Sequence, residues 1–373
     1  MLSAGALISS FDRFALSPLL FFIATEMGVP LHEAVAIASS YFFAYGLAQL
    51  LWGGLADRVG KVRLLQIVML GAGVAGLLSA VAPNLVLLTI ARALTGFFMG
   101  GVFPTSITYV GDTIALKFRQ PALADLMAAA ALGIASATAV AGIVGDLFGW
   151  RWMFAIPAVA ITACAFFLTR LTDTRGQRPA GGLASYGRAL RLGWVWALVG
   201  LVFVEGALLL GILTFLAPAL QAIGYSASVA GLTVTAYGVS TLLSTRLVRS
   251  VASKLGRGRM MLLGGASATI GYAILGTHVS LLTVLVCSFF HGVAWAFMHS
   301  SFQTWATEIS SEHRSTVVSL FVTALFSGSA VGATAGGVLA TADAWQPLFW
   351  ATSAALLVLT MIAVFARGKY ENR

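Results

Sequence analysis

Twelve apolar runs, each long enough to cross a lipid bilayer, limit most strongly what this chain can fold into. A membrane-spanning helix needs about 20 largely apolar residues in succession. The runs lie at 4–25, 34–54, 64–82, 85–111, 121–145 and 150–170, and then at 194–217, 226–248, 260–277, 281–306, 315–340 and 345–366. The sequence therefore predicts an all-α membrane protein of twelve transmembrane helices, embedded in the lipid bilayer.

One long polar segment divides the runs into two sets of six. Residues 172–192 read TDTRGQRPAGGLASYGRALRL, and their Gly, Pro and Arg content is typical of a linker. We therefore expect an N-terminal six-helix bundle at 1–171, a cytoplasmic linker at 172–192 and a C-terminal six-helix bundle at 193–373.

The basic residues lie almost entirely on one side of the predicted membrane. Of the 22 Lys and Arg residues, all but Arg13, Arg92 and Arg151 fall at the chain end or in loops on the side of the two termini. Basic loops mark the cytoplasmic side, so we expect cytoplasmic termini, an even number of spans and a location in a bacterial inner membrane. The net charge of +9 then needs no nucleic-acid partner.

Other broad classes of protein find little support in the sequence. Hydrophobic residues make up 59% of the chain and charged residues only 9%, too few charges for an ordinary water-exposed surface. The sequence shows no metal-spaced His, Cys and Glu set, no Ser-His-Asp arrangement and no nucleotide-binding loop. We therefore expect no enzyme activity, no cofactor and no metal site, and we expect a monomer. The lack of room for an extramembrane domain disfavours a membrane sensor.

The loop between the second and third runs carries a specific pattern. It reads GGLADRVGKVR at 53–63, a glycine followed by an acid and a basic cluster in a set order: Gly53, Asp57, Arg58, Gly60, Lys61 and Arg63. The acid suits the N-terminus of the next helix, and Arg58 requires a carboxylate across the same face, for which Asp112 is the candidate. In pattern and position this loop resembles the signature of the Major Facilitator Superfamily.

That resemblance implies two pseudo-symmetric six-helix bundles that work as a secondary transporter. It also implies a gating motif made of Gly53, Asp57, Arg58, Gly60, Lys61 and Asp112. The equivalent loop of the second half reads ASKLGRGRMM at 252–261 and keeps a glycine and two arginines, but it has Ser253 or Lys254 where the acid belongs. A degenerate second copy favours two repeated halves.

Two further stretches resemble patterns of the same family. ARALTGFFMGG contains Arg92, Gly96 and Gly100 and resembles the fourth-helix motif, in which a buried arginine faces the central cavity. GDLFGWRWMF at 145–154 resembles the outer end of the fifth and sixth helices in drug-efflux members. The Gly-Pro of the antiporter motif is missing, because Ala137 and Thr138 stand there.

Six ionisable residues fall at membrane depth: Asp12, Arg13, Arg92, Glu205, His291 and His299. A charge in hydrocarbon costs at least about 2.5 to 3.5 kcal/mol, so each residue needs a cavity or a partner. The six lie in the first, fourth, seventh and tenth helices, which line the central cavity in the family that the chain resembles. Helical spacing places five residues of the tenth helix on one stripe, a candidate wall of a substrate cavity: His291, Trp295, Met298, His299 and Phe302.

The roles of these residues stay open at this point. Glu205 has no basic residue in its own helix and is a candidate for proton coupling, with Asp12 as the other; a protonated structural hydrogen bond is the alternative for Glu205. Asp12 and Arg13 lie about 100° apart on a helix, so they cannot both point directly into a cavity. Arg13 and Arg92 are further substrate-cavity candidates, in addition to the residues of the stripe. Either histidine can instead form a hydrogen bond to a neighbouring helix.

The leading hypothesis is proton-coupled efflux of a small amphiphilic drug or metabolite by alternating access. The alternative is a carrier, symporter or uniporter, for a small organic anion, favoured by Arg92 with the histidines and by the missing Gly-Pro. We also expect Arg92, Glu205 and both histidines to converge in one central cavity, because a shared space relieves their desolvation costs together. Asp57, Arg58 and Asp112 are expected to form a cytoplasmic charge cluster. This cluster would close the inner side of the N-terminal half in the outward-open state.

Overall fold

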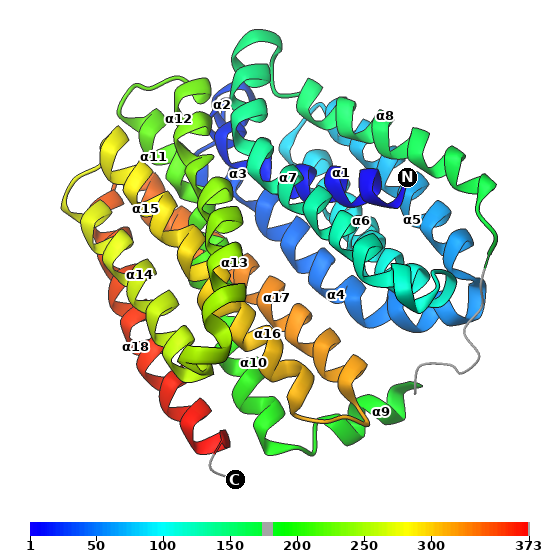
Figure 1. The fold of residues 1–373 in the computed structure, drawn as a ribbon. Coiled ribbons are helices and arrows are strands. Elements are labelled where there is room, and N and C mark those ends of the chain that lie inside the picture. Colours follow the sequence, from blue (N-terminus) through cyan, green and yellow to red (C-terminus); the bar gives the residue numbers. More distant parts are fainter. Residues whose placement is uncertain (174–181, 372–373) are drawn as a thin grey trace.

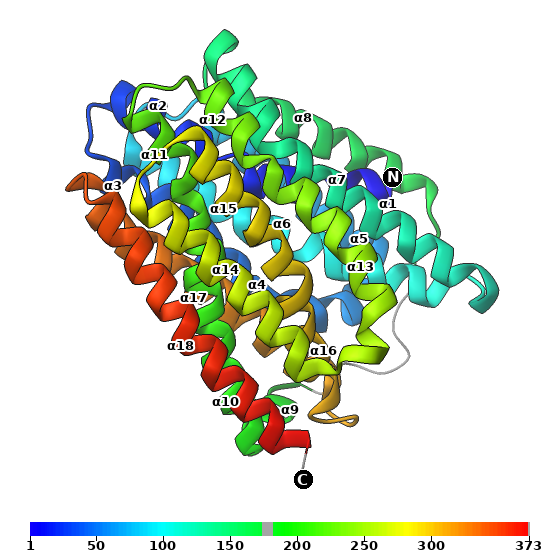
Figure 2. The same cartoon turned by 60° about the vertical axis from the view of Figure 1, so that its left-hand side comes forward.

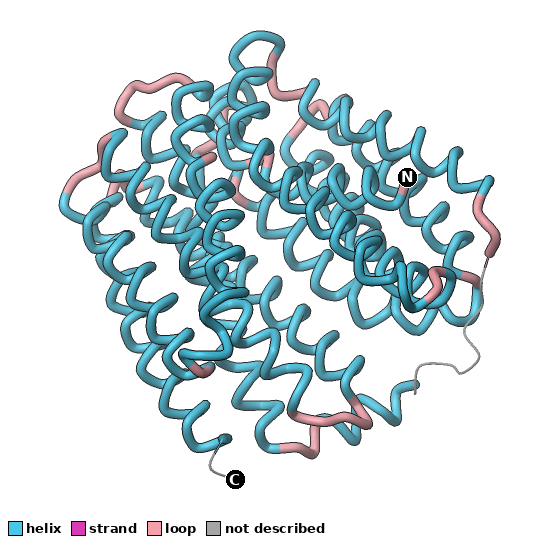
Figure 3. Tube along the Cα trace, in the orientation of Figure 1, coloured by secondary structure: helices cyan, strands magenta, loops and turns pink. Residues whose placement is uncertain are grey.

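The computed structural model describes residues 1–173 and 182–371, and at positions 53, 57, 182–184 and 252–253 it describes the backbone alone. Over these ranges the chain is helical, with loops mainly at the two ends of the helices (Figure 3). The elements of the first half are α1 (Leu2–Phe14), η1 (Ser17–Leu19), α2 (Leu20–Met27), α3 (Leu31–Ala34), α4 (Ala36–Val59), α5 (Lys61–Ala80), α6 (Leu85–Thr113), α7 (Leu116–Phe148), α8 (Trp152–Phe167) and η2 (Leu168–Arg170).

The second part begins with a short helix, α9, that precedes the next membrane spans. Its elements are α9 (Gly182–Ala189), α10 (Gly193–Glu205), the π-helical turn η3 (Gly206–Gly211), η4 (Ile212–Phe215), α11 (Leu216–Ala222), α12 (Ala227–Val234), α13 (Ala236–Leu255), α14 (Arg257–Thr277), α15 (Leu281–Ala294), the π-helical turn η5 (Trp295–His299), α16 (Ser300–Glu308), α17 (Arg314–Thr341) and α18 (Trp345–Glu371).

Twelve membrane spans follow from these elements. Among the described residues, eleven helices are long and apolar enough to cross a bilayer, and a twelfth span is the pair Leu2–Phe14 and Ser17–Met27, bent by 41°. Pro18 stands in the first turn after this bend, where its ring and missing N–H are incompatible with a continuous helix. The predicted all-α fold with twelve spans is confirmed.

The outer surface has the apolar character that lipid contact requires. Phe166 and Phe365 are 66% and 64% exposed, and many other large apolar side chains are exposed along the spans. The buried polar and charged residues lie inside the bundles instead, among them Arg92 and Glu205. This distribution is expected for a protein whose solvent is hydrocarbon, since polar groups there need internal partners.

The helices form two bundles that meet along two helix pairs. α1 to α8 lie together on one side and α10 to α18 on the other (Figures 1 and 2), while α4 packs against α17 and α7 against α12. The approach of α7 and α12 is very close: a Cβ at Gly142 would lie 2.2 Å from the Ala227 carbonyl oxygen, and one at Gly231 2.1 Å from that of Thr138. Only glycine permits this backbone contact.

Three of the hydrogen bonds between the bundles lie at the ends of the spans opposite the α4–α5 loop. The His32 amide donates to Thr341 Oγ1 at 2.8 Å, the Ser228 amide to Asp146 Oδ2 at 2.7 Å, and Gln221 Nε2 to the carbonyl of Pro18 at 2.9 Å. The two bundles are thus joined at this end, which we call the closed end.

A short helix bridges the bundles near their opposite ends. α9 falls within the predicted linker 172–192, of which residues 174–181 lie outside the described part. Ser185 Oγ lies 2.9 Å from Thr316 Oγ1 of α17, and the Tyr186 hydroxyl donates to the carbonyl of Leu50 in α4 at 3.3 Å. α9 therefore contacts both halves, while the predicted domain limits at 171 and 193 remain a prediction.

Candidate functional site

Asp12 and Arg92 form a buried, bidentate ion pair within the first bundle. Arg92 Nη1 donates to Asp12 Oδ1 at 2.9 Å and Nη2 to Oδ2 at 3.0 Å, across the contact of α1 with α6. The side chains are only 1% and 3% exposed. The guanidinium also lies over the rings of Tyr41 and Phe154, 4.7 and 4.6 Å from their centroids. The charge of Arg92 is therefore neutralised inside its own bundle.

Arg13, the next residue along α1, has a different environment. Its Nη2 donates to the Tyr45 hydroxyl at 2.8 Å, and its guanidinium lies over the rings of Tyr45 and Phe326 at 4.4 and 5.2 Å. Within the described part of the chain, no carboxylate lies within ion-pair distance of Arg13, and its Nε has no hydrogen-bond partner. Arg13 thus keeps a net positive charge at membrane depth.

Arg13 and Arg92 both line a cavity between the two bundles. Its wall comes from α1, α4, α6 and α7 of the first half and from η3, η4, α12 and α13 of the second. Tyr41, Phe14 and Tyr237 supply aromatic surface, and the cavity volume is about 30 Å³. A mostly apolar wall with a few polar groups has the composition of a small-molecule site, but this conformation leaves room for little more than a water molecule.

The second buried pair lies in the other bundle. His299 Nδ1 is 3.4 Å from Glu205 Oε2, and Glu205 is fully buried with no partner for its other carboxylate oxygen among the described atoms. Glu205 ends α10 immediately before η3, and His299 is the last residue of η5. The imidazole of His299 also stacks on Trp295, with centroids 3.9 Å apart. π-helical turns of this kind occur frequently at functional sites.

The predicted stripe on the tenth span is divided by η5. His291 lies before η5, is fully buried, and has its Nδ1 3.2 Å from the hydroxyl of Tyr272 on α14. Met298 and Phe302 are also fully buried. A π-helical turn contains more residues than an α-helical turn, so the 3.6-residue spacing that predicted one stripe does not continue through Trp295–His299. His291 thus contacts a neighbouring helix, which was the alternative to a place in the cavity wall.

The prediction that all these groups share one cavity is wrong. The cavity is lined by Arg13 and Arg92, whereas Glu205, His291 and His299 are absent from its wall. The physical reason is that pairing inside each bundle already relieves the cost of burial, as Asp12 does for Arg92. The structure therefore brings together Asp12 with Arg92 and Glu205 with His299, and it keeps the two pairs apart.

The loop at 53–63 makes contacts that differ from those predicted. Lys61 Nζ lies 2.5 Å from Asp112 Oδ2, whereas Arg58 is exposed, so the predicted pair of Arg58 with Asp112 is wrong. Lys61 is the first residue of α5, which packs on α6 and directs this side chain to the end of α6 at Asp112. The side chains of Gly53 and Asp57 lie outside the described residues.

A residue that sequence reasoning missed, Asp173, also contacts this loop. The Val62 amide donates to Asp173 Oδ1 at 2.8 Å, so the carboxylate occupies the N-terminus of α5 that was assigned to Asp57. Gly60 has φ of +106°, and a Cβ there would lie 2.2 Å from Asp173 Oδ2. Both the backbone conformation and the carboxylate contact require glycine at this position.

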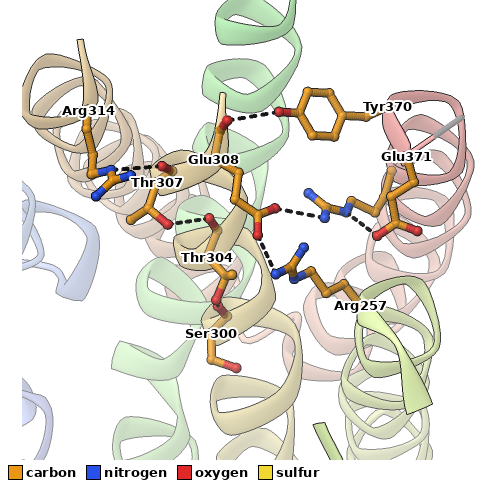
Figure 4. Close-up of polar contacts among 9 residues, drawn as sticks. Arg257, Ser300, Thr304, Thr307, Glu308, Arg314, Tyr370 and Glu371 are labelled. Carbon is orange, nitrogen blue, oxygen red and sulfur yellow. Dashed lines mark hydrogen bonds and ion pairs between the residues drawn. The ribbon is translucent and has the colours of Figure 1, made fainter. Parts of the chain in front are cut away.

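The second half contains a matching but larger charge cluster (Figure 4). Glu308, at the end of α16, binds Arg257 at the start of α14 and Arg367 of α18, the latter at 2.9 Å. Arg367 is 1% exposed and also pairs with Glu371 at 2.8 Å. The Tyr370 hydroxyl donates to the backbone carbonyl of Glu308 at 3.1 Å. The last turns of α18 are thereby held against α16.

The two clusters follow one plan. Gly60 and Gly256 both have positive φ, at +106° and +70°, and each is followed by a basic residue that begins a helix. That residue is Lys61 in one half and Arg257 in the other, and each binds an acid near or at the end of the next span along the chain, Asp112 or Glu308. Superposing the two sequence copies at their glycines would have identified Glu308, but nothing local in the sequence indicated Arg367.

Comparisons with known sequences agree with this repeated architecture. The family model for the Major Facilitator Superfamily matches residues 2–226 and 198–372. The chain is 26% identical over 374 residues to the inner membrane transport protein YnfM of Escherichia coli, covering 96% of this chain and 87% of that protein. It is 29% identical over 166 residues to the multidrug resistance protein MdtG of Proteus mirabilis, which covers 43% of this chain and 41% of that protein.

Solved structures show the same fold at low sequence identity. A D-xylose-proton symporter matches with a TM-score of 0.79 and 16% identity, over 96% of this chain and 95% of that chain. The POT family transporter PepTSo matches with a TM-score of 0.81 and 12% identity, over 100% of this chain and 98% of that chain. With the family matched along both halves, this multi-pass membrane protein belongs to the Major Facilitator Superfamily and is a transporter of small molecules rather than an enzyme.

Proposed function

We propose that this chain is a proton-coupled secondary transporter that exports a small amphiphilic compound by alternating access, with Glu205 and His299 carrying the coupled proton. The observation that carries the proposal is the environment of Glu205. It is fully buried, and among the described atoms its polar contact is His299 Nδ1 at 3.4 Å, while its Oε1 has no partner there. An isolated carboxylate in such a place is expensive, so a proton shared with the imidazole is the favourable state.

The surroundings of this pair supply a way to link protonation to helix movement. η3 begins directly after Glu205 and η5 ends at His299, so both partners lie at irregular turns of their spans. α17 packs tightly here, because a Cβ at Gly206 would lie 1.9 Å from the Leu325 carbonyl oxygen. A change of charge between two spans is therefore positioned to alter how they pack against α17.

Asp12, the other coupling candidate, is better suited to a structural role. Both of its carboxylate oxygens accept hydrogen bonds from Arg92, at 2.9 and 3.0 Å. This arrangement favours a permanently charged pair, because protonating Asp12 would leave the buried guanidinium without its counter-charge. Arg92 is, by the same argument, a poor anion receptor, and each histidine has a neighbour at its Nδ1, Glu205 for His299 and Tyr272 for His291.

The proposal also includes the orientation of the chain in the membrane and a monomer as the transporting unit. If the basic loops are cytoplasmic, the closed end faces outward and the described conformation is closed on the outside. A single chain supplies both bundles and the whole cavity between them, which supports a monomer as the transporting unit. The name of the similar multidrug resistance protein MdtG supports export, and the name of the similar inner membrane transport protein YnfM supports a bacterial inner membrane.

The experiment is transport by the purified chain in liposomes under an imposed proton gradient, with cationic, neutral and anionic test compounds. We expect gradient-driven transport by the wild type. E205Q should lose it while keeping exchange of substrate across the membrane without a gradient, because exchange needs no net proton movement. E33Q, at an exposed acid of α3, is the matched control. Equal gradient dependence of E205Q and wild type would refute the coupling role of Glu205.

A further inference from the structure

Four exposed basic residues at the junction of α13 and α14 lack an acidic partner in the described part of the chain. They are Arg246, Arg249, Lys254 and Arg259, and we call them the basic patch. The ion pairs among the described residues do not include any of them. Arg257, which lies within the same stretch, instead points inward and binds Glu308 (Figure 4). The patch therefore presents four positive charges to its surroundings.

The corresponding junction of the first half has acids close to its basic residues. Lys61 pairs with Asp112, and the loop at 53–63 contains Asp57 as well. The copy at 252–261 has Ser253 or Lys254 at the position of that acid. The second half thus lacks a carboxylate where it keeps the basic residues, so a specific counter-charge for the patch has to come from outside the chain.

Exposed apolar side chains adjoin the patch on both helices. Leu243 and Leu247 of α13 are each 53% exposed, with Arg246 between them in the sequence. On α14, Leu263 is 47% exposed and follows Arg259 by four residues. Residues three and four apart share one face of a helix, so the exposed surface changes from apolar to basic toward the junction. Such a change is typical of the boundary between hydrocarbon and headgroups, where long basic side chains extend toward the headgroups.

We propose that the basic patch binds the phosphate groups of anionic phospholipids at the adjoining membrane surface, while Leu243 and Leu247 contact their acyl chains. Basic residues beside a membrane span attract anionic headgroups, and each one near the surface strengthens binding about fivefold. Arginine and lysine are both suited to this role, because their N–H groups donate to phosphate oxygens. The inference goes beyond the proposed transport function and does not depend on the substrate or on proton coupling.

The neighbouring leucines favour a lipid over a soluble anionic partner. A nucleic acid or an acidic protein segment offers charge but would leave Leu243 and Leu247 without hydrocarbon, whereas a phospholipid supplies both phosphate and acyl chains. The position of the patch agrees, because α13 belongs to the membrane span Ala227–Val251, and Arg246 and Arg249 lie in its last turns. These side chains are therefore held at the membrane surface by the span itself.

The test measures which lipids lie next to the patch in the full chain, reconstituted in phosphatidylcholine liposomes. A bimane fluorophore on S250C, in a C164A/C287A background, reports from an exposed position within the patch. Phosphatidylglycerol or phosphatidylcholine with brominated acyl chains is then added, because bromine quenches a fluorophore that it contacts. We expect half-maximal quenching at an about tenfold lower mole fraction of phosphatidylglycerol than of phosphatidylcholine, and a smaller difference at high salt. R246Q/R249Q/K254Q should reduce the difference to less than about twofold.

R63Q/K117Q/R170Q is the matched control, because it removes three exposed basic residues from the first half and should keep the preference. Equal quenching by the two lipids in the wild type, an unchanged preference in R246Q/R249Q/K254Q, or an equal loss in the control would overturn the inference. Glycerophosphoglycerol, the headgroup without acyl chains, should displace phosphatidylglycerol poorly, and efficient displacement would overturn the role of the membrane surface. The assay contains neither a substrate nor a proton gradient, so its outcome is independent of the proposed coupling by Glu205.

Discussion

Replacing Asp12 by Asn leaves the Arg92 guanidinium buried without its carboxylate. Arg92 is 1% exposed and donates to Asp12 at 2.9 and 3.0 Å, so water cannot replace the lost charge. Breaking one partner of such a pair costs about 3 to 5 kcal/mol. The cation–π contacts with Tyr41 and Phe154 remain and offset part of this loss, which places the expected cost near the lower limit, about 3 kcal/mol.

The assay is equilibrium unfolding of the purified chain in mixed micelles, followed by circular dichroism. E26Q is the matched control, because it breaks an ion pair with Arg151 in which the two side chains are 49% and 43% exposed. An exposed pair contributes at most about 1 kcal/mol. The double variant D12N/R92M should recover much of the stability lost in D12N, since it removes the unpaired charge. A loss for D12N no larger than for E26Q would refute the account of a buried pair.

Three further predictions concern the two ends of the bundles. D57N should reduce transport while expression stays near that of the wild type, and unchanged transport in liposomes would remove this residue from the proposed gate. E308Q should lower the free energy of unfolding by about 2 kcal/mol, because the buried Arg367 of α18 loses one of its two carboxylate partners and keeps Glu371; micelle unfolding measures this, and a loss below about 1 kcal/mol would contradict it. G142A should force α7 away from α12, since its Cβ would lie 2.2 Å from a carbonyl oxygen. Cysteines at Ser39 and Thr334, whose hydroxyls are 2.9 Å apart, should then crosslink less, and an unchanged yield would count against tight packing at the closed end.

Much of the architecture could be predicted because it depends on local properties of the sequence. Bilayer thickness sets the length of an apolar run, so the number of spans can be read along the chain without knowing how the helices pack. The loop pattern at 53–63 and its weaker copy at 252–261 likewise indicated two repeated halves and the family. Gly60 and Gly256 immediately precede corresponding helices, and their positive φ shows why the glycines of that pattern are needed.

Only the tertiary structure decided which charged residues meet. Asp12 pairs with Arg92, which is 80 residues away in the sequence, and Glu205 contacts His299, which is 94 residues away. Such partnerships depend on how each helix is rotated and how deeply it lies, and the π-helical turns change that rotation within a span. The sequence pattern identified the ionisable residues at membrane depth, but helix packing determined that Asp12 meets Arg92, that Glu205 meets His299 and that Arg13 lines the cavity between the bundles.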